Sequence, residues 1–246
     1  MEYLLEAELR ALGVDIERVS PLGVSAQMDL SLIYHVSLWS RLANRILIRL
    51  FSGEVNNVAA LSQLCGRFDW STVFTVDRTL AIDYYGESSF IKNTMFGAQL
   101  IKDAIVDYFK PTGHRPSVDK QKPNIRLQAH WRRGELTVSL DVVGYSLHQR
   151  GYRQQTGRAP LKENIAAAML VRAGWPELSA QGAHFVDPFC GSGTLLIEAA
   201  LMAGNLAPGL FRQDQSFPYW QQHDDTLWQS IRQQALLVQK PIANTF

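Results

Sequence analysis

The stretch FVDPFCGSGTLLIEAA, residues 185–200, is the most informative part of this chain. A short apolar run ends at Asp187-Pro188, the chain turns through Gly191 and Gly193, and a helical pattern of apolar residues follows. A strand, a tight turn and a helix in this order leave the first backbone amides of the helix free to face a bound anion. The stretch therefore predicts the first strand–loop–helix junction of a nucleotide-binding α/β domain.

The position of this junction is as informative as its composition. Only 53 of the 246 residues follow Gly193, whereas a doubly wound domain needs several further βα units after its first. The expectation is that the chain carries the beginning of such a domain and not the rest of it.

The glycine turn also narrows the choice of ligand. A dinucleotide fingerprint would place its third glycine at position 196, which is Leu196. No Gly-Lys-Ser/Thr follows, and Ser192 lacks the Gly-x-Ser-x-Gly frame of a nucleophile elbow. S-adenosylmethionine fits better, because helix amides can bind its carboxylate and Asp187 can favour its amine. A purely structural glycine turn is the alternative.

Two other side chains of the stretch have simple explanations. Cys190 has no base next to it in sequence, so a small residue in a tight turn is favoured over a nucleophile. Glu198 lies about one turn into the predicted helix, where a carboxylate interacts favourably with the N-terminal dipole. Any ligand contact of Glu198 would be secondary.

Composition indicates a globular protein of one or two domains, with 46% hydrophobic residues. No apolar run reaches the roughly 18 to 20 residues of a bilayer span, and the first residues do not resemble a signal peptide. Cys65 and Cys190 form no metal-site spacing and suggest no disulfide framework. These features favour the reducing cytoplasm, without a metal and without a membrane partner.

The net charge of +1 conceals an uneven distribution. Residues 88–158 hold 12 Lys/Arg against 5 Asp/Glu, or +7, between flanks of −4 (residues 1–87) and −2 (residues 159–246). A basic middle between acidic flanks is typical of a module that binds a polyanion, although a solvated surface with a chance excess of cations is the alternative.

Periodicity predicts an α+β arrangement before this junction. The predicted helices cover residues 2–12, 30–44, 61–68 and 93–108, and the predicted strands cover 14–19, 22–28, 46–51 and 73–78. A hairpin follows over 125–140, with its turn at 132–134 and one face exposed to water.

The rest of the pattern is a polar linker followed by helices. Residues 144–160 predict the linker, and 161–173 predict a helix with Ile165, Ala168 and Met169 facing inward. The strand of the junction covers His184–Asp187, and an amphipathic helix over 227–238 follows it.

Several segments together resemble the THUMP-containing RNA guanine-N2 methyltransferases, over essentially the whole chain. DPFCGSGT at 187–194 resembles the cofactor motif of that family, and residues 93–107 resemble its THUMP helix. The segment that joins the two domains of the family is matched by SLD at 139–141, LH at 147–148, RGYR at 150–153 and APLKE at 159–163. The similarity is greatest to the bacterial members that modify large-subunit ribosomal RNA.

The resemblance implies a fold, a cofactor and a partner. The fold is an α+β N-terminal region, ferredoxin-like over 1–31 and THUMP over 32–143, followed over 144–246 by a linker and a truncated α/β Rossmann-like class I methyltransferase domain. The implied S-adenosylmethionine site is Asp187, Pro188, Phe189, Cys190, Gly191, Ser192, Gly193 and Thr194. The implied partner is RNA, most of all large-subunit ribosomal RNA, with candidate contacts at Lys92, Asn93, Lys102, Arg126, Arg132, Arg133, Arg150 and Arg153.

The sequence also departs from the family pattern. The family opens with a strand and a short Arg-Gly turn that are not found before Glu2. Its Asn-Pro-Pro-Tyr motif, which holds the guanine amine, occurs nowhere here, and Asp224-Asp225 is a poor substitute for its ribose-binding acid. The resemblance therefore implies no catalytic residue in this chain, and inactivity unless a C-terminal methyltransferase polypeptide completes the site.

Two hypotheses of different class follow. In the first, the chain is the N-terminal portion of an S-adenosylmethionine-dependent ribosomal RNA guanine-N2 methyltransferase. In the second, it is a non-catalytic RNA-binding protein whose glycine turn is a structural remnant. A continuation of the coding sequence past Phe246 into an acid-ended strand and Asn-Pro-Pro-Tyr would favour the first hypothesis.

Overall fold

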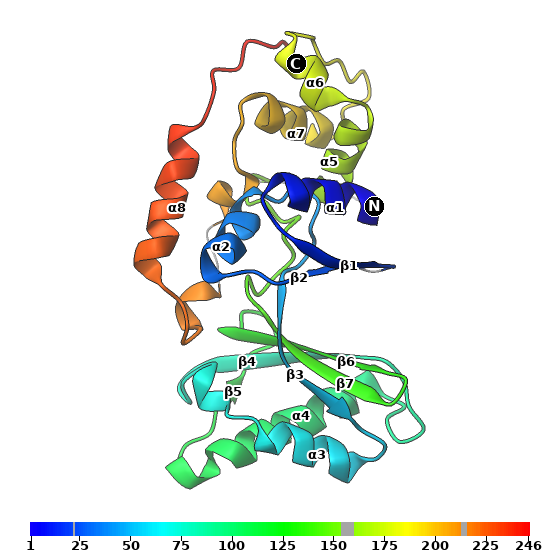
Figure 1. Cartoon of the computed structure of the whole chain (residues 1–246), viewed down its shortest axis with the longest axis vertical. Coiled ribbons are helices and arrows are strands. Elements are labelled where there is room, and N and C mark those ends of the chain that lie inside the picture. Colours follow the sequence, from blue (N-terminus) through cyan, green and yellow to red (C-terminus); the bar gives the residue numbers. More distant parts are fainter. Residues whose placement is uncertain (22, 154–159, 213–215) are drawn as a thin grey trace. The chain divides into compact units, whose positions relative to one another are not determined.

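The computed structural model describes residues 1–21, 23–153, 160–212 and 216–246, which form two compact units. Unit 1 draws on residues 1–44, 146–214 and 224–246, and unit 2 draws on 45–145 and 215–223. Each unit is therefore assembled from segments that are distant in sequence (Figure 1). Within the described ranges, no helix combines the length and the apolar character that a membrane span requires.

Unit 2 is built on a five-stranded sheet with the strand order β3-β7-β6-β4-β5. The hairpin of β6 and β7 forms as expected, and its turn residues Arg133 and Gly134 both have positive φ. β4 runs parallel to β6, which requires a crossover connection, and α4 provides it. The strands are β3 Leu47–Glu54, β4 Thr79–Tyr85, β5 Ser117–Val118, β6 Ile125–Arg132 and β7 Glu135–Asp141.

Two helices, α3 (Val58–Arg67) and α4 (Thr94–Phe109), pack together on one face of this sheet (Figure 1). Asparagine side chains cap both helices: Asn57 accepts from the Ala60 amide and Asn93 from the Met95 amide, each at 2.8 Å. The core between helices and sheet is aromatic and aliphatic, and includes Leu61, Trp70, Phe74, Leu80, Ile101, Ile105, Ile125 and Leu127.

Unit 2 corrects two expectations. The predicted strand at 73–78 is wrong: a short 3-10 helix at Trp70–Thr72 turns the chain, and β4 begins only at Thr79. Val73 and Phe74 are apolar because they enter the core from a loop, which periodicity does not distinguish from a strand. The exposed hairpin face is also wrong in part, because Gln128, Ser139 and Asp141 are buried. Asp141 pairs with Arg45 and accepts a hydrogen bond from the Gly144 amide.

Unit 1 is mainly helical, with one two-stranded antiparallel ribbon. Its N-terminal elements are α1 Glu2–Ala11, β1 Ile16–Ser20, β2 Gly23–Ala26 and α2 Leu30–Trp39, and its later helices are α5 Glu163–Arg172, α6 Trp175–Ala180, α7 Thr194–Ala203 and α8 Asp225–Leu237. Leu4 and Leu5 of α1 and Met202 of α7 pack against a buried cluster of Leu42 with Ala167 and Ala168 of α5. Residues from the two ends of the chain thus share one core.

Three expectations for unit 1 also change. The helix predicted over 30–44 ends at Trp39. On α5, Ile165 and Met169 are exposed, whereas Glu163 and Asn164 are buried. Glu163 accepts a hydrogen bond from Arg153 of the linker, and a hydrophobicity pattern does not detect a partner of this kind.

The strand predicted at His184–Asp187 is wrong for the chain as described. Residues 184–187 have no regular secondary structure, and no described strand pairs with them. Their neighbour is the C-terminal segment, where the Phe185 amide donates to the Thr245 carbonyl at 3.0 Å. A strand needs a ladder of hydrogen bonds, and a single bond does not form one. Leu22 of the predicted strand over 22–28 and residues 154–159 of the predicted linker over 144–160 lie outside the described residues.

Candidate functional site

The predicted glycine turn forms at the start of α7. Gly191 has φ +55° and Gly193 has φ +73°, both in the left-handed region that favours glycine, and a Cβ at Gly191 would meet nothing within 4 Å. The Asp187 carboxylate accepts a hydrogen bond from the Phe189 amide at 3.0 Å. Within the described part of the chain, the first three amides of α7 have no acceptor, as at any uncapped helix start.

This geometry suits a ligand that carries an anionic group. The free amides of α7 point out of the helix start, and the open space above Gly191 lets the backbone approach a ligand closely. The turn faces solvent: Phe189 is 94% exposed, and Asp187 and Cys190 are accessible. A carboxylate beside the helix start is the arrangement that an amino-acid moiety requires. The turn therefore fits one end of S-adenosylmethionine.

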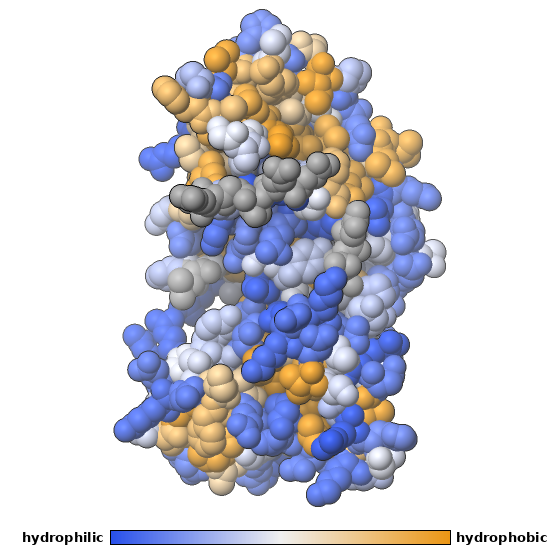
Figure 2. Space-filling view, turned by 180° about the vertical axis from the view of Figure 1, so that it is seen from behind, coloured by the Kyte–Doolittle hydropathy of each residue, from blue (hydrophilic) through white to orange (hydrophobic). Residues whose placement is uncertain are grey.

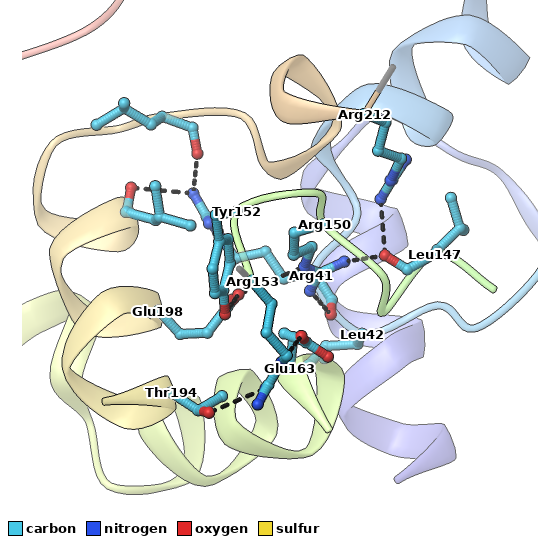
Figure 3. Close-up of polar contacts among 12 residues, drawn as sticks. Arg41, Leu42, Leu147, Arg150, Tyr152, Arg153, Glu163, Thr194, Glu198 and Arg212 are labelled. Carbon is cyan, nitrogen blue, oxygen red and sulfur yellow. Dashed lines mark hydrogen bonds and ion pairs between the residues drawn. The ribbon is translucent and has the colours of Figure 1, made fainter. Parts of the chain in front are cut away.

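Arg153 holds the turn from the side (Figure 3). Its guanidinium donates to Ser192 Oγ at 3.2 Å and Thr194 Oγ1 at 3.0 Å in the turn, and to Glu163 Oε1 and the Leu161 carbonyl, both at 3.0 Å, at the start of α5. One planar side chain thus joins the linker, α5 and the turn, which a lysine with its single ammonium group could not do.

Arg150, from the same RGYR segment, is buried and not at the surface. Only 1% of its surface is exposed, and it donates to the carbonyls of Leu147 at 2.8 Å and Arg41 at 2.5 Å. Its Nε lies 3.4 Å from Glu198 Oε1, and that same oxygen accepts the Tyr152 hydroxyl at 3.0 Å. Burial and then the Glu198 carboxylate raise the pKa of the Tyr152 hydroxyl. Glu198 is thus part of an interior ion pair behind the turn.

Further charged groups surround this pair. Arg41 donates to the Leu206 carbonyl at 2.8 Å, and removal from water lowers the pKa of its guanidinium to about 10. Arg212 donates to the Leu147 carbonyl (Figure 3) and to the Ser37 carbonyl. Arg41 and Arg212 were not predicted to have a role, and neither were Tyr152 and Glu163, although these two lie in the RGYR and APLKE segments. Arginines inside otherwise apolar stretches were the available signal, because such arginines are rarely buried without carbonyl or carboxylate partners.

The Glu8 carboxylate of α1 binds the backbone next to Arg41. Glu8 accepts hydrogen bonds from the Ser40 hydroxyl at 2.6 Å and from the Arg41 amide at 2.7 Å. These bonds follow the end of α2 and explain why that helix stops at Trp39. Burial raises the pKa of the Glu8 carboxyl despite these donors.

The candidate RNA contacts of unit 2 fall into two groups. Lys92, Asn93, Arg132 and Arg133 are exposed, the first two at the start of α4 and the arginines at the β6–β7 turn. Lys102 and Arg126 are partly buried and already paired. Lys102 contacts its neighbour Asp103, and Arg126 contacts Asp83 at 2.9 Å.

Comparisons with known proteins identify the domains. The chain matches three family profiles in order: the RlmL ferredoxin-like domain over residues 1–47, the THUMP domain over 55–141, and the RMKL-like methyltransferase domain over 150–243. The predicted fold class, α+β followed by a Rossmann-like methyltransferase fold, is confirmed.

Relatives and solved structures agree with these profiles. Ribosomal RNA large subunit methyltransferase K/L of Legionella pneumophila is 59% identical over 244 residues, which is 99% of this chain and 34% of that protein. Two solved structures cover nearly the whole chain. A predicted N6-adenine-specific DNA methylase from Listeria monocytogenes has TM-score 0.84 and 28% identity, over 99% of this chain and 63% of its own. SMU.472, a putative methyltransferase complexed with SAH, has TM-score 0.82 and 30% identity, over 97% and 62%.

The chain spans about a third of the length of the curated relatives that it matches. All three profiles and these relatives agree along its whole length. The chain therefore carries sequence of the RlmL ferredoxin-like, THUMP and RMKL-like methyltransferase domains, and it is similar over 99% of its length to a ribosomal RNA large subunit methyltransferase K/L.

Proposed function

We propose that this chain supplies the RNA-binding region and one side of the cofactor site of an S-adenosylmethionine-dependent guanine-N2 methyltransferase that acts on large-subunit ribosomal RNA in the cytoplasm. The observation that carries the proposal is the turn at 187–194, where free helix amides, an open glycine and an accessible carboxylate adjoin. Similarity to the K/L methyltransferases supports the reaction class, and the SAH complex of SMU.472 supports the cofactor.

In this proposal, the residues of the cofactor motif contact different parts of S-adenosylmethionine. The amides that follow Gly193 would bind the carboxylate of the cofactor, and Asp187 would bind its amine. Gly191 and Cys190 would leave room for the backbone to approach. When bound, S-adenosylmethionine supplies the methyl group on its sulfonium. Arg153 keeps Ser192 and Thr194 in place, so the turn needs no reordering when the ligand arrives.

RNA binding is assigned to the exposed cations of unit 2. Lys92, Arg132 and Arg133 would contact phosphates, with Asn93 as a polar neighbour, and Lys102 and Arg126 would add charge close by. Phosphate contacts release counterions, so affinity is expected to fall steeply with salt. Shape and not groove sequence would govern the choice of a structured RNA.

The guanine amine requires a further anchor. The Asn-Pro-Pro-Tyr motif is not among these 246 residues, so we propose that another methyltransferase polypeptide segment supplies it. Methyl transfer then depends chiefly on positioning of a base that is taken out of its stack. Exposed apolar side chains support such a complement: in unit 1, Val186, Phe189 and Leu237 are each more than four-fifths exposed. Figure 2 shows apolar residues gathered at the end of unit 1 formed by α5, α6 and α7.

The test measures binding and transfer separately. Titration of the 246-residue chain with S-adenosylhomocysteine should give weak binding, because loss of the ribose-binding acid costs about 1.5 to 3 kcal/mol. Asp187→Ala should weaken binding further, whereas Asp15→Ala, an exposed acid of the same unit, should not. Labelled cofactor with unmodified ribosomal RNA should give no methyl incorporation from the chain alone, and incorporation after addition of the rest of a relative's methyltransferase domain.

Each result distinguishes the hypotheses. Incorporation by the chain alone would show that the chemistry needs no group outside it. RNA binding without any cofactor binding, even in the complemented mixture, would favour the non-catalytic RNA-binding protein.

A further inference from the structure

Unit 2 contains an open cleft of about 530 Å³ that the cofactor site does not use. It lies between β4, α4, the last residue of the parallel edge strand β5, Val118, and Lys120 just after that strand. The volume is in the range of pockets that hold a small organic group. All of its lining residues belong to unit 2.

One wall of the cleft is a strand edge with free hydrogen-bonding groups. β5 pairs only with Thr79 and Leu80, so β4 beyond Leu80 has no described partner on that side (Figure 1). The Leu80 carbonyl accepts from the Asp119 amide at this edge. Backbone groups of a strand alternate between its two sides, so those of Ile82 and Tyr84 point to the same open edge. Each residue presents one donor and one acceptor there.

The other walls combine apolar surface with positive charge. Met95 on α4 is 67% exposed, and Tyr85 and Val118 are exposed at the rim. Lys102, Lys120 and Arg126 also line the cleft, against one acid, Asp83. Arg126 is held in place by Asp83 and by the carbonyls of Gly144 and Lys120.

A buried hydroxyl adds an unsatisfied group. The Tyr84 ring lies against Gly97 of α4, where an added Cβ would be 2.7 Å from the ring. Its hydroxyl is buried and has no hydrogen-bond partner among the described residues, which is costly for a polar group. The hydroxyl oxygen has almost no accessible surface, so a ligand in the cleft would contact the backbone of Tyr84 at the open edge and not its hydroxyl.

We propose that this cleft binds one unpaired nucleotide of the RNA, with the base against the open edge of β4 and its phosphates near Lys102 and Lys120. A flat base offers donors and acceptors in its plane, which match the paired N–H and C=O groups of an edge strand. Its faces suit the apolar surfaces of Met95 and Val118, and its phosphates suit the cations. This assignment rests on the proposed RNA binding. It adds that the chain binds an RNA stem with an unpaired nucleotide more tightly than a continuous duplex.

The test uses two hairpins of equal length, one fully paired and one with a single bulged 2-aminopurine. The 246-residue chain should bind the bulged hairpin about tenfold more tightly, with a change in the fluorescence of the bulged base. Met95→Ala and Lys102→Ala should reduce this ratio to about threefold or less. The matched controls are Phe96→Ala and Lys110→Ala, neighbours that do not line the cleft, and they should leave the ratio unchanged.

Three outcomes would overturn the assignment. Equal binding of the two hairpins, unaffected by Met95→Ala, would refute the cleft while leaving RNA binding intact. No binding of either hairpin would refute the proposed RNA binding itself. Displacement of the bulged base by an extended acidic peptide at lower concentration than by a competing bulged RNA would assign the edge of β4 to a protein strand.

Discussion

The two units of this chain are held together by different kinds of interior interaction. Unit 2 closes a five-stranded sheet with two helices, and the core between helices and sheet is mainly aliphatic and aromatic. Unit 1 has helices around a network of arginines and carboxylates, and its segment 184–187 has no strand partner in the described chain. The difference shows that the THUMP region is held by apolar packing, whereas the cofactor turn is held by a few charge-assisted hydrogen bonds.

The two cysteines make this comparison measurable, because one lies in each unit. Cys65 is fully buried in unit 2, and burial raises the pKa of its thiol to about 12. Cys190 is exposed in the turn of unit 1. A thiol reagent should therefore label Cys190 in the native protein and Cys65 only when unit 2 opens. Labelling of Cys65 reports on unit 2, and hydrogen exchange of α5 and α7 reports on unit 1.

The largest effect is expected for Arg150→Ala. The change leaves Glu198 as an uncompensated buried charge and removes donors from the carbonyls of Arg41 and Leu147. Unit 1 should lose about 3 to 5 kcal/mol of stability. Amide exchange in α5 and α7 should accelerate, while Cys65 stays protected. Arg10→Ala, which breaks an exposed pair on α1, is the control and should change little. Loss of Cys65 protection in Arg150→Ala would show that the units do not open separately.

The second prediction is that Gly97→Ala destabilises unit 2 and leaves unit 1 unchanged. A Cβ would lie 2.7 Å from the Tyr84 ring, and overpacking of this kind costs about 1 to 3 kcal/mol. Cys65 should be labelled at lower denaturant, with exchange in α7 unchanged. Gly66→Ala on α3, where an added Cβ meets nothing within 4 Å, is the matched control and should stabilise by about 0.5 to 1 kcal/mol. Equal behaviour of the two variants would mean that α4 can move away from β4 at little cost.

The smallest effect is expected for Arg153→Lys. The lysine keeps the charge but cannot reach Glu163, Ser192 and Thr194 together. Binding of S-adenosylhomocysteine in the complemented mixture should weaken about tenfold, which is about 1.4 kcal/mol. RNA affinity should not change, and this separates a positioning role from an RNA contact. If the variant kept its cofactor affinity but bound RNA more weakly, Arg153 would be an RNA contact and not a residue that positions the turn.

The sequence alone determined the features that depend on neighbouring residues. The turn at 187–194 was recognisable because glycines with positive φ and a following helix are encoded locally, and the same holds for the Asn93 cap and the turn at Arg133-Gly134. The resemblance of the RGYR segment and the THUMP helix to one family implied the fold class that the comparisons confirm.

Only the tertiary structure decided which charges face inward and which strands pair. Arg150 and Arg153 are three residues apart in one basic segment, yet Arg150 is interior and Arg153 reaches the turn, because Glu198 and Thr194 come from a helix more than 40 residues away. Val73 and Phe74 have the composition of a strand but fill a core from a loop. Residues 184–187 have the composition of a strand but form no ladder in the described chain. In each case the partner is distant in sequence, so no local pattern contains it.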